Sequence, residues 1–258
     1  MGANVFYDSV TDATIANVSI SHNNDNTSPN TLVNEVLDEF KNEFATSVND
    51  LRTAKSIYDT IDTGYSKPVV TKPYRLPLHY KDEITKQVEE ALRNNIIRSS
   101  SSPWCSSVVL VPKKDGKIRM CVDYRKLNNI NERDEYPLPR LEDTLDMLSG
   151  STVFTSLDLQ CGYWQIPVAE EDIPKTAFSP GNGLGLFEFI KKPFGLSNAP
   201  ATFQRGMDAM LKKVPNAMAY LDDIIIFSRN ITDHTTHVKT VLAILLQEIL
   251  RVNLSKSK

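Results

Sequence analysis

The chain has 258 residues, of which 41% are apolar and 24% are charged, a composition typical of one large or two modest globular domains. No apolar run is long enough to cross a bilayer, and the N-terminus lacks a basic-then-apolar signal, so we expect an intracellular protein without a membrane partner. Three cysteines show no close pairing, which argues against a zinc knuckle or a disulfide framework.

The net charge of −3 is unevenly distributed along the chain. Residues 1–66 carry a net charge of −7, whereas residues 67–133 carry +7. A basic block beside an acidic centre suits a protein that holds phosphates and a metal at once, although a solvated basic face fits the charge pattern equally well.

The N-terminal part of the chain predicts a flexible acidic leader over residues 1–60. Residues 1–30 are rich in Asn, Ser, Thr and Asp, and residues 31–46 have the apolar spacing of one short amphipathic helix. Asp62-Thr63-Gly64 is also the signature of aspartic proteases, but no strand-rich unit surrounds it here. A protease site at Asp62 therefore stays a weaker alternative.

The remainder of the chain, residues 61–258, predicts one mixed domain of helices and short strands. Helical spacing appears over residues 81–97, 139–148, 199–214 and 234–250. Short apolar, β-branched runs predict strands over residues 108–111, 118–122, 152–159 and 187–190.

Four cations gather on the hairpin that residues 108–122 predict. Its tip and second strand carry Lys113, Lys114, Lys117 and Arg119, which repel one another unless an anion lies between them. A nucleotide triphosphate would fit, because Lys supplies a point charge and Arg grips phosphate oxygens bidentately. An ordinary charged turn is the simpler alternative.

A second hairpin places two carboxylates at its turn. Asp222 and Asp223 lie between the apolar runs 217–221 and 224–227, and Asp158 lies near the end of an earlier apolar strand. Like charges in apolar surroundings repel strongly, and Mg²⁺ would relieve that repulsion because it prefers carboxylate oxygens. The alternatives are an acidic surface turn and a structural, hydrogen-bonded Asp158.

Several longer blocks follow one another in a distinctive order. They are Ser101-Ser102-Pro103-Trp104, Val122-Asp123-Tyr124-Arg125-Lys126-Leu127-Asn128, Tyr136-Pro137-Leu138-Pro139, Leu157-Asp158-Leu159, Gly162-Tyr163-Trp164-Gln165, Pro193-Phe194-Gly195-Leu196, Pro200-Ala201-Thr202-Phe203-Gln204 and Tyr220-Leu221-Asp222-Asp223. From about residue 60 to its end, the chain resembles the reverse transcriptases of gypsy-class LTR retrotransposons.

The resemblance implies an α+β fold with right-hand polymerase fingers and palm, a core over residues 94–258, and an antiparallel palm sheet backed by helices. The implied activity is that of an RNA-directed DNA polymerase, a nucleotidyltransferase that uses two Mg²⁺ ions, for which Mn²⁺ could substitute. The catalytic and metal-binding residues would be Asp158, Asp222 and Asp223. Leu159 would add a main-chain carbonyl to the metal site.

The resemblance also implies a nucleotide-binding site. Tyr163 matches the aromatic steric gate that leaves no room for a 2′-hydroxyl, and Arg119 matches the triphosphate-binding arginine, with Lys113 as its partner. Phe194 occupies the position where retroviral enzymes carry a glutamine near the sugar. The implied partners are dNTPs and an RNA or DNA template with its primer.

The blocks that follow the palm in this family are not found in the sequence. No primer-grip strand, thumb, RNase H or integrase block follows residue 250, so we expect the thumb to be missing and these Pol domains to complete a full-length product. The alternative is a truncated, non-catalytic remnant that at most binds nucleic acid.

Overall fold

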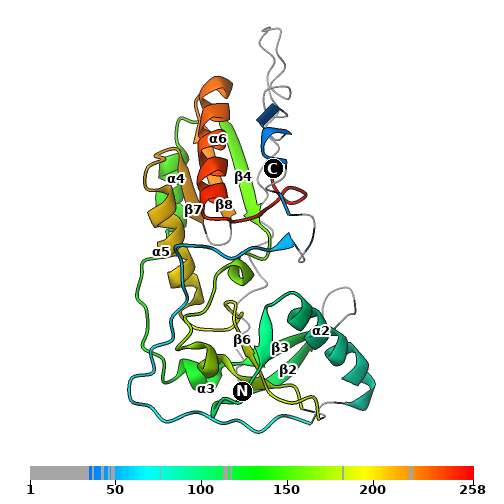
Figure 1. The fold of residues 1–258 in the computed structure, drawn as a ribbon. Coiled ribbons are helices and arrows are strands. Elements are labelled where there is room, and N and C mark those ends of the chain that lie inside the picture. Colours follow the sequence, from blue (N-terminus) through cyan, green and yellow to red (C-terminus); the bar gives the residue numbers. More distant parts are fainter. Residues whose placement is uncertain are drawn as a thin grey trace.

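The computed structural model describes residues 35, 36, 38–41, 44, 45, 47, 50–75, 77–112, 116, 118–181, 183–220 and 223–258. Figure 1 shows two lobes, each built around its own sheet, with strands β2, β3 and β6 in one lobe and β4, β7 and β8 in the other. Among the described residues, no helix combines the length and the apolar character needed to traverse a bilayer.

The first lobe contains a five-stranded sheet in the order β1-β6-β5-β2-β3. Its strands are β1 (Ile97–Ser99), β2 (Ser106–Pro112), β3 (Ile118–Asp123), β5 (Phe178–Ser179) and β6 (Phe187–Phe189). The helical elements beside it are η3 (Leu78–Tyr80), α2 (Lys81–Arg93), α3 (Arg125–Asn128) and η5 (Ile173–Thr176). All strand pairs are antiparallel except β2 with β5.

The sequence prediction for this lobe is confirmed at its hairpin and corrected at its first helix. β2 and β3 pair antiparallel, as the apolar runs predicted, and their register sets Val108 opposite Val122. Helix α2 ends at Arg93 rather than at residue 97, because Asn95 adopts a left-handed φ of 51° that a helix cannot contain. Ile97 then begins β1.

The second lobe contains a four-stranded antiparallel sheet in the order β7-β8-β4-β9. Its strands are β7 (Ala217–Tyr220), β8 (Asp223–Ser228), β4 (Val153–Leu159) and β9 (Val252–Asn253). The helices of this lobe are α4 (Leu141–Leu148), η4 (Gly162–Gln165), α5 (Ala199–Leu211) and α6 (Ile231–Gln247).

The two faces of this sheet differ in what covers them. Leu157 and Ile224 face each other across β4 and β8, and both belong to a buried cluster that includes Met207 of α5 and Val241 of α6. Because successive side chains point to opposite faces, Asp158 projects from the face that α5 and α6 do not cover. The antiparallel palm-type sheet backed by helices is therefore confirmed.

A segment assigned to the leader contributes to this second lobe. Ala54 and Ile57 are buried in the cluster of the four-stranded sheet, and the Ala54 amide donates to the Gln165 carbonyl at 2.7 Å. Further along, Asp59 forms a parallel bridge with Val168. Residues 51–60 thus run as a strap across the lobe, whereas half of the predicted helix 31–46 lies outside the described residues.

The contact between this strap and α5 gives a test of the packing. A Cβ added at Gly206 would lie 2.7 Å from Ile57 Cγ1 and 3.0 Å from Cγ2, so Gly206→Ala should lower the free energy of unfolding by about 1–2 kcal/mol through overpacking. In an Ile57→Ala background the same change should instead stabilise by up to about 1 kcal/mol, since Ala favours helix. Urea unfolding of the four chains measures both effects, and an unchanged sign in the two backgrounds would contradict the contact.

Candidate active site

Two of the three predicted carboxylates come together where β4 and β8 lie side by side. In the antiparallel register Asp158 is directly opposite Asp223, with Ile224 opposite Leu157 one step further. Directly opposed residues share a face and have Cβ atoms roughly 5 Å apart, so two like charges are held near each other. Asp222, the third predicted carboxylate, lies outside the described residues and stays a prediction.

Asp158 is only partly satisfied by the surrounding protein. Its Oδ1 is buried and has no hydrogen-bond partner among the described residues, while its Oδ2 lies 3.8 Å from Lys256 Nζ. Burial raises the pKa of Asp158, and the nearby Lys256 charge opposes that rise. An anionic oxygen left without a donor in this position is the type of atom that a cation would coordinate.

The C-terminal tail carries the lysine that sequence reasoning missed. β9 pairs with β4 so that Asn253 lies opposite Asp158, and Ser257 Oγ accepts a hydrogen bond from the Asp158 amide at 3.2 Å. The tail then closes on β4 through paired backbone bonds between Ser156 and Lys258. Residues 250–258 show no periodicity, so no signal in the sequence marked Lys256 as a neighbour of Asp158.

Gln165 anchors this tail from the interior. Its side chain is fully buried, donates to the carbonyls of Gln160 and Arg251 at 2.9 Å each, and accepts from the Arg251 amide at 2.7 Å. Gln165, the last residue of η4, therefore fixes the start of the tail that brings Lys256 to the Asp158 carboxylate.

The structure also brings together two predicted nucleotide-binding residues. Tyr163 lies in η4 just after β4, and its ring centroid is 5.3 Å from that of Phe194. Phe194 is 56% exposed, so one side of this aromatic pair is open to solvent. Trp164 contacts the same Phe194 ring at 5.9 Å in an edge-on arrangement.

Three other residues were predicted for the site, and the structure places two of them. Leu159 is buried on β4 beside Asp158 and pairs with Val252. Arg119 is exposed on β3 of the other sheet, where it lies opposite Val111. Lys113 lies outside the described residues, so its pairing with Arg119 stays a prediction.

The residues present fit a divalent metal, although the described part of the chain completes no site. Among the described residues no group of three or more His, Cys, Asp or Glu could hold a metal ion, and Asp222 is not one of those residues. Asp158 and Asp223 nevertheless lie directly opposite each other, and Asp158 Oδ1 has no hydrogen-bond partner in the described part of the chain.

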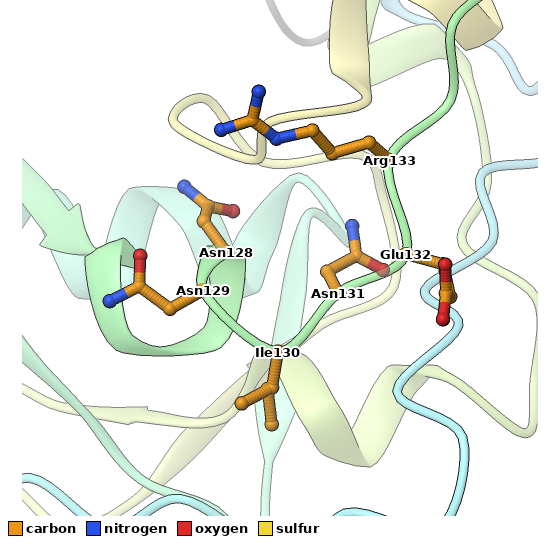
Figure 2. A pocket seen from close by; sticks show the side chains of 6 residues that line it. All are labelled: Asn128, Asn129, Ile130, Asn131, Glu132 and Arg133. Atoms are coloured by element: carbon orange, nitrogen blue, oxygen red, sulfur yellow. The ribbon is translucent and has the colours of Figure 1, made fainter.

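A separate polar pocket of about 500 Å³ lies in the loop after α3 and contains none of the predicted site residues. Figure 2 shows the amides of Asn128 and Asn129 on one side of this loop and the Arg133 guanidinium extended above it. The side-chain amide of Asn128 donates a hydrogen bond to the Gly195 carbonyl at 2.8 Å, which ties the loop to the turn after Phe194.

Comparisons with known proteins show which family the chain belongs to. The family model "Reverse transcriptase (RNA-dependent DNA polymerase)" matches residues 111–258. The Pol polyprotein of the Drosophila melanogaster transposon opus is 39% identical over 233 residues, covering 88% of this chain and 23% of the polyprotein. The polyprotein of the Drosophila transposon gypsy is 38% identical and covers 84% of this chain and 22% of its own length.

Solved structures show the same fold. The protease-reverse transcriptase of prototype foamy virus superimposes with a TM-score of 0.78 at 27% identity, over 88% of this chain and 30% of that protein. A foamy viral protease-reverse transcriptase in complex with an RNA/DNA hybrid gives a TM-score of 0.78 at 25% identity, over 91% of this chain and 31% of that protein.

The chain thus spans about a quarter of each of the two Drosophila polyproteins, and the family model matches residues 111–258 of the chain. The fold class and the resemblance to gypsy-class retrotransposons, both expected from the sequence blocks, are confirmed. The chain belongs to the reverse transcriptase (RNA-dependent DNA polymerase) family.

Proposed function

We propose that this chain is the fingers and palm of an RNA-directed DNA polymerase of retrotransposon origin that transfers nucleotides with the help of two metal ions. The observation that carries the proposal is the register that sets Asp158 opposite Asp223 on the face of the sheet that α5 and α6 do not cover. Two carboxylates directly opposite each other in a sheet repel and cost stability, and a bound cation would offset that cost.

The proposed metal ligands are Asp158, Asp222, Asp223 and the Leu159 carbonyl. When bound, two Mg²⁺ ions supply the charge that activates the primer 3′-hydroxyl and neutralises the leaving pyrophosphate. The carboxylates themselves fix where that charge lies relative to the primer end. Lys256 holds a positive charge beside Asp158 and so favours the ionised carboxylate that coordination requires.

The other proposed roles concern the incoming nucleotide. Tyr163 excludes a 2′-hydroxyl with its ring, Phe194 lines the sugar position, and Arg119 with Lys113 holds the triphosphate. The proposed partners are dNTPs, a primer on an RNA or DNA template, and the remaining Pol domains. The template proposal is supported by the foamy viral relative, whose solved complex contains an RNA/DNA hybrid.

Primer extension tests the proposal. The chain, alone and joined to the thumb of a relative such as the opus polyprotein, is incubated with a primed RNA template, dNTPs and Mg²⁺. We expect the joined chain to extend the primer and to stop when the divalent ion is chelated. The isolated chain should be slower, because loss of primer orientation removes much of a polymerase's rate.

The alternative of a non-catalytic remnant makes the opposite prediction. Neither form would then extend the primer, while binding to the primer–template would persist and weaken steeply as salt increases. Extension that continues after chelation of all divalent ions would contradict the metal-dependent scheme.

A further inference from the structure

A buried ion pair connects the N-terminal strap to the loop that precedes Phe194. Lys192 Nζ lies 3.0 Å from Asp59 Oδ1, and the two side chains are 0% and 2% exposed. Burial raises the pKa of Asp59 and lowers that of Lys192, and each partner opposes the shift in the other. A buried ion pair is often no more stable than an apolar pair of equal volume, so stability alone does not explain these residues.

The position of the Lys192 ammonium is itself unfavourable for a positive charge. Lys192 Nζ donates to the carbonyl of Ala199 at 2.6 Å, in the first turn of α5. The N-terminal end of a helix carries a partial positive charge, which disfavours a cation there. Asp59 supplies the compensating negative charge, so the pair keeps an ammonium at a position where a lone lysine would not stay.

The ammonium is directed at the ring proposed to select the sugar. Lys192 Nζ lies 5.2 Å from the centroid of the Tyr163 ring, within the range of a cation–π contact. Phe194 and Phe203 contact the same ring at 5.3 Å and 5.6 Å, so Tyr163 is held between two aromatic rings and one cation. Tyr163 also packs against the buried clusters of both lobes, which places it at their junction.

Both members of the ion pair are fixed by the backbone that surrounds Tyr163. The Asp59 amide donates to the Pro167 carbonyl, and the Ala169 amide donates to the Asp59 carbonyl, each at 2.9 Å. The Lys192 amide donates to the Ile166 carbonyl at 2.8 Å. Because residues 166–169 directly follow η4, the strap and Lys192 are both tied to the chain that carries the ring.

We propose that Lys192, held in place by Asp59 from the N-terminal strap, is a positioning residue that fixes the Tyr163 ring for the choice between deoxyribonucleotides and ribonucleotides. The inference rests on the proposed function, in which Tyr163 excludes a 2′-hydroxyl. It adds that this exclusion depends on a segment about a hundred residues away in the sequence.

Two variants separate positioning from stability. Lys192→Met leaves the buried Asp59 carboxyl without its partner, so this chain should unfold at a lower temperature. Asp59→Asn combined with Lys192→Met removes both charges, and much of the thermal stability should return. Neither chain has an ammonium beside the ring, so both should lose discrimination between dNTPs and rNTPs.

The decisive activity measurement is the ratio of kcat/KM for a dNTP to that for the matching rNTP, in the chain joined to a relative's thumb. We expect this ratio to fall about tenfold in both variants, since displacing a positioned group by an ångström can cost up to about a hundredfold. Lys191→Met is the matched control: the Lys191 ammonium donates to the Thr53 hydroxyl on the strap, and this variant should keep the wild-type ratio. A ratio that recovers together with stability in the double variant would overturn the proposal.

A second readout keeps this inference separate from the proposed function. In the chain labelled with fluorotyrosine, the fluorine NMR resonance of Tyr163 is identified by its loss in Tyr163→Phe. We expect this resonance to shift in both Lys192→Met chains and to stay in place in Lys191→Met. If the wild-type chain incorporates no nucleotide, the proposed function fails. Independently of that result, a Tyr163 resonance that does not move in the Lys192→Met chains would overturn the role of Lys192. In an active chain, an unchanged ratio overturns the proposal even where the resonance shifts.

Discussion

Replacing Asp158 with Asn should lower nucleotide incorporation by about a thousandfold or more, because each tenfold loss corresponds to only about 1.4 kcal/mol of transition-state stabilisation. The amide keeps the shape of the carboxylate but not the negative charge that faces Asp223 across β4 and β8. Charge stabilisation by a bound metal contributes several kcal/mol to such a transfer, and it requires anionic ligands. Single-nucleotide extension in Mg²⁺ by the chain joined to a relative's thumb measures the loss.

The same variant should retain its stability or gain some. Burial raises the pKa of Asp158, so the folded state holds the proton more tightly than the unfolded state and loses stability as the group ionises with rising pH. Asn removes that loss and also the repulsion from Asp223. Thermal unfolding at neutral pH should therefore show an unchanged or higher midpoint, together with the lost activity.

An exposed carboxylate provides the control for both measurements. Asp146 lies exposed on α4, and Asp146→Asn should leave incorporation within about twofold of the wild-type chain, as is usual for surface positions. Asp158→Asn that unfolds more easily, or that retains a tenth of the wild-type rate, would contradict the assignment of Asp158 as a metal ligand.

The parts of the fold that the sequence predicted are those made by neighbours in the chain. β2 with β3 and β7 with β8 are hairpins, so their apolar runs and the turn residues between them lie within one short window. The long helices α5 and α6 show helical apolar spacing and were found with boundary shifts of a few residues.

The parts that could not be predicted depend on pairing between distant segments. β9 has two residues and pairs with β4 more than ninety residues earlier, so no local pattern identifies it as a strand. The strap at Asp59 is similar: its residues carry no periodicity, and its place is fixed by Val168 and by the buried Lys192. Two polar residues far apart in the sequence do not reveal a buried pair.

The candidate site likewise has a part that the sequence predicted and a part that depends on pairing between distant segments. The residues alone left a surface turn and a metal site open at Asp222 and Asp223, and the resemblance to a known family favoured the metal site. Opposition of Asp158 and Asp223 follows from the strand register, which the sequence does not specify between β4 and β8. Lys256 was missed because its approach to Asp158 depends on β9.

A buried histidine ties α6 to the two strands that carry these carboxylates. His234 is 1% exposed, with Nδ1 3.0 Å from Ser228 Oγ on β8 and Nε2 2.8 Å from Thr155 Oγ1 on β4. Burial lowers the pKa of His234 to about 4 from an ordinary value of 6.5, and the neighbouring His237 contributes a smaller part of the shift. The folded state therefore holds this imidazole in its neutral form.

Acidification should destabilise the protein through His234. The unfolded state binds the proton near pH 6.5 and the folded state only near pH 4, so the stabilisation is complete above pH 6.5 and is lost as pH falls towards 4. Each unit of pKa difference corresponds to about 1.4 kcal/mol, which gives a loss of roughly 3 kcal/mol across this window. Urea unfolding at a series of pH values measures the slope.

Two substitutions isolate the contribution of His234 from that of the carboxylates that titrate nearby. His234→Gln should lower stability at neutral pH by about 1–3 kcal/mol, since it leaves the Ser228 and Thr155 hydroxyls with poorer partners, and it should flatten the slope below pH 6.5. His79 is exposed beside α2, so His79→Gln should keep the wild-type slope. If stability still falls with the same slope below pH 6.5 in His234→Gln, the titrating group lies elsewhere. The link between α6 and the two strands would then be independent of the charge on His234.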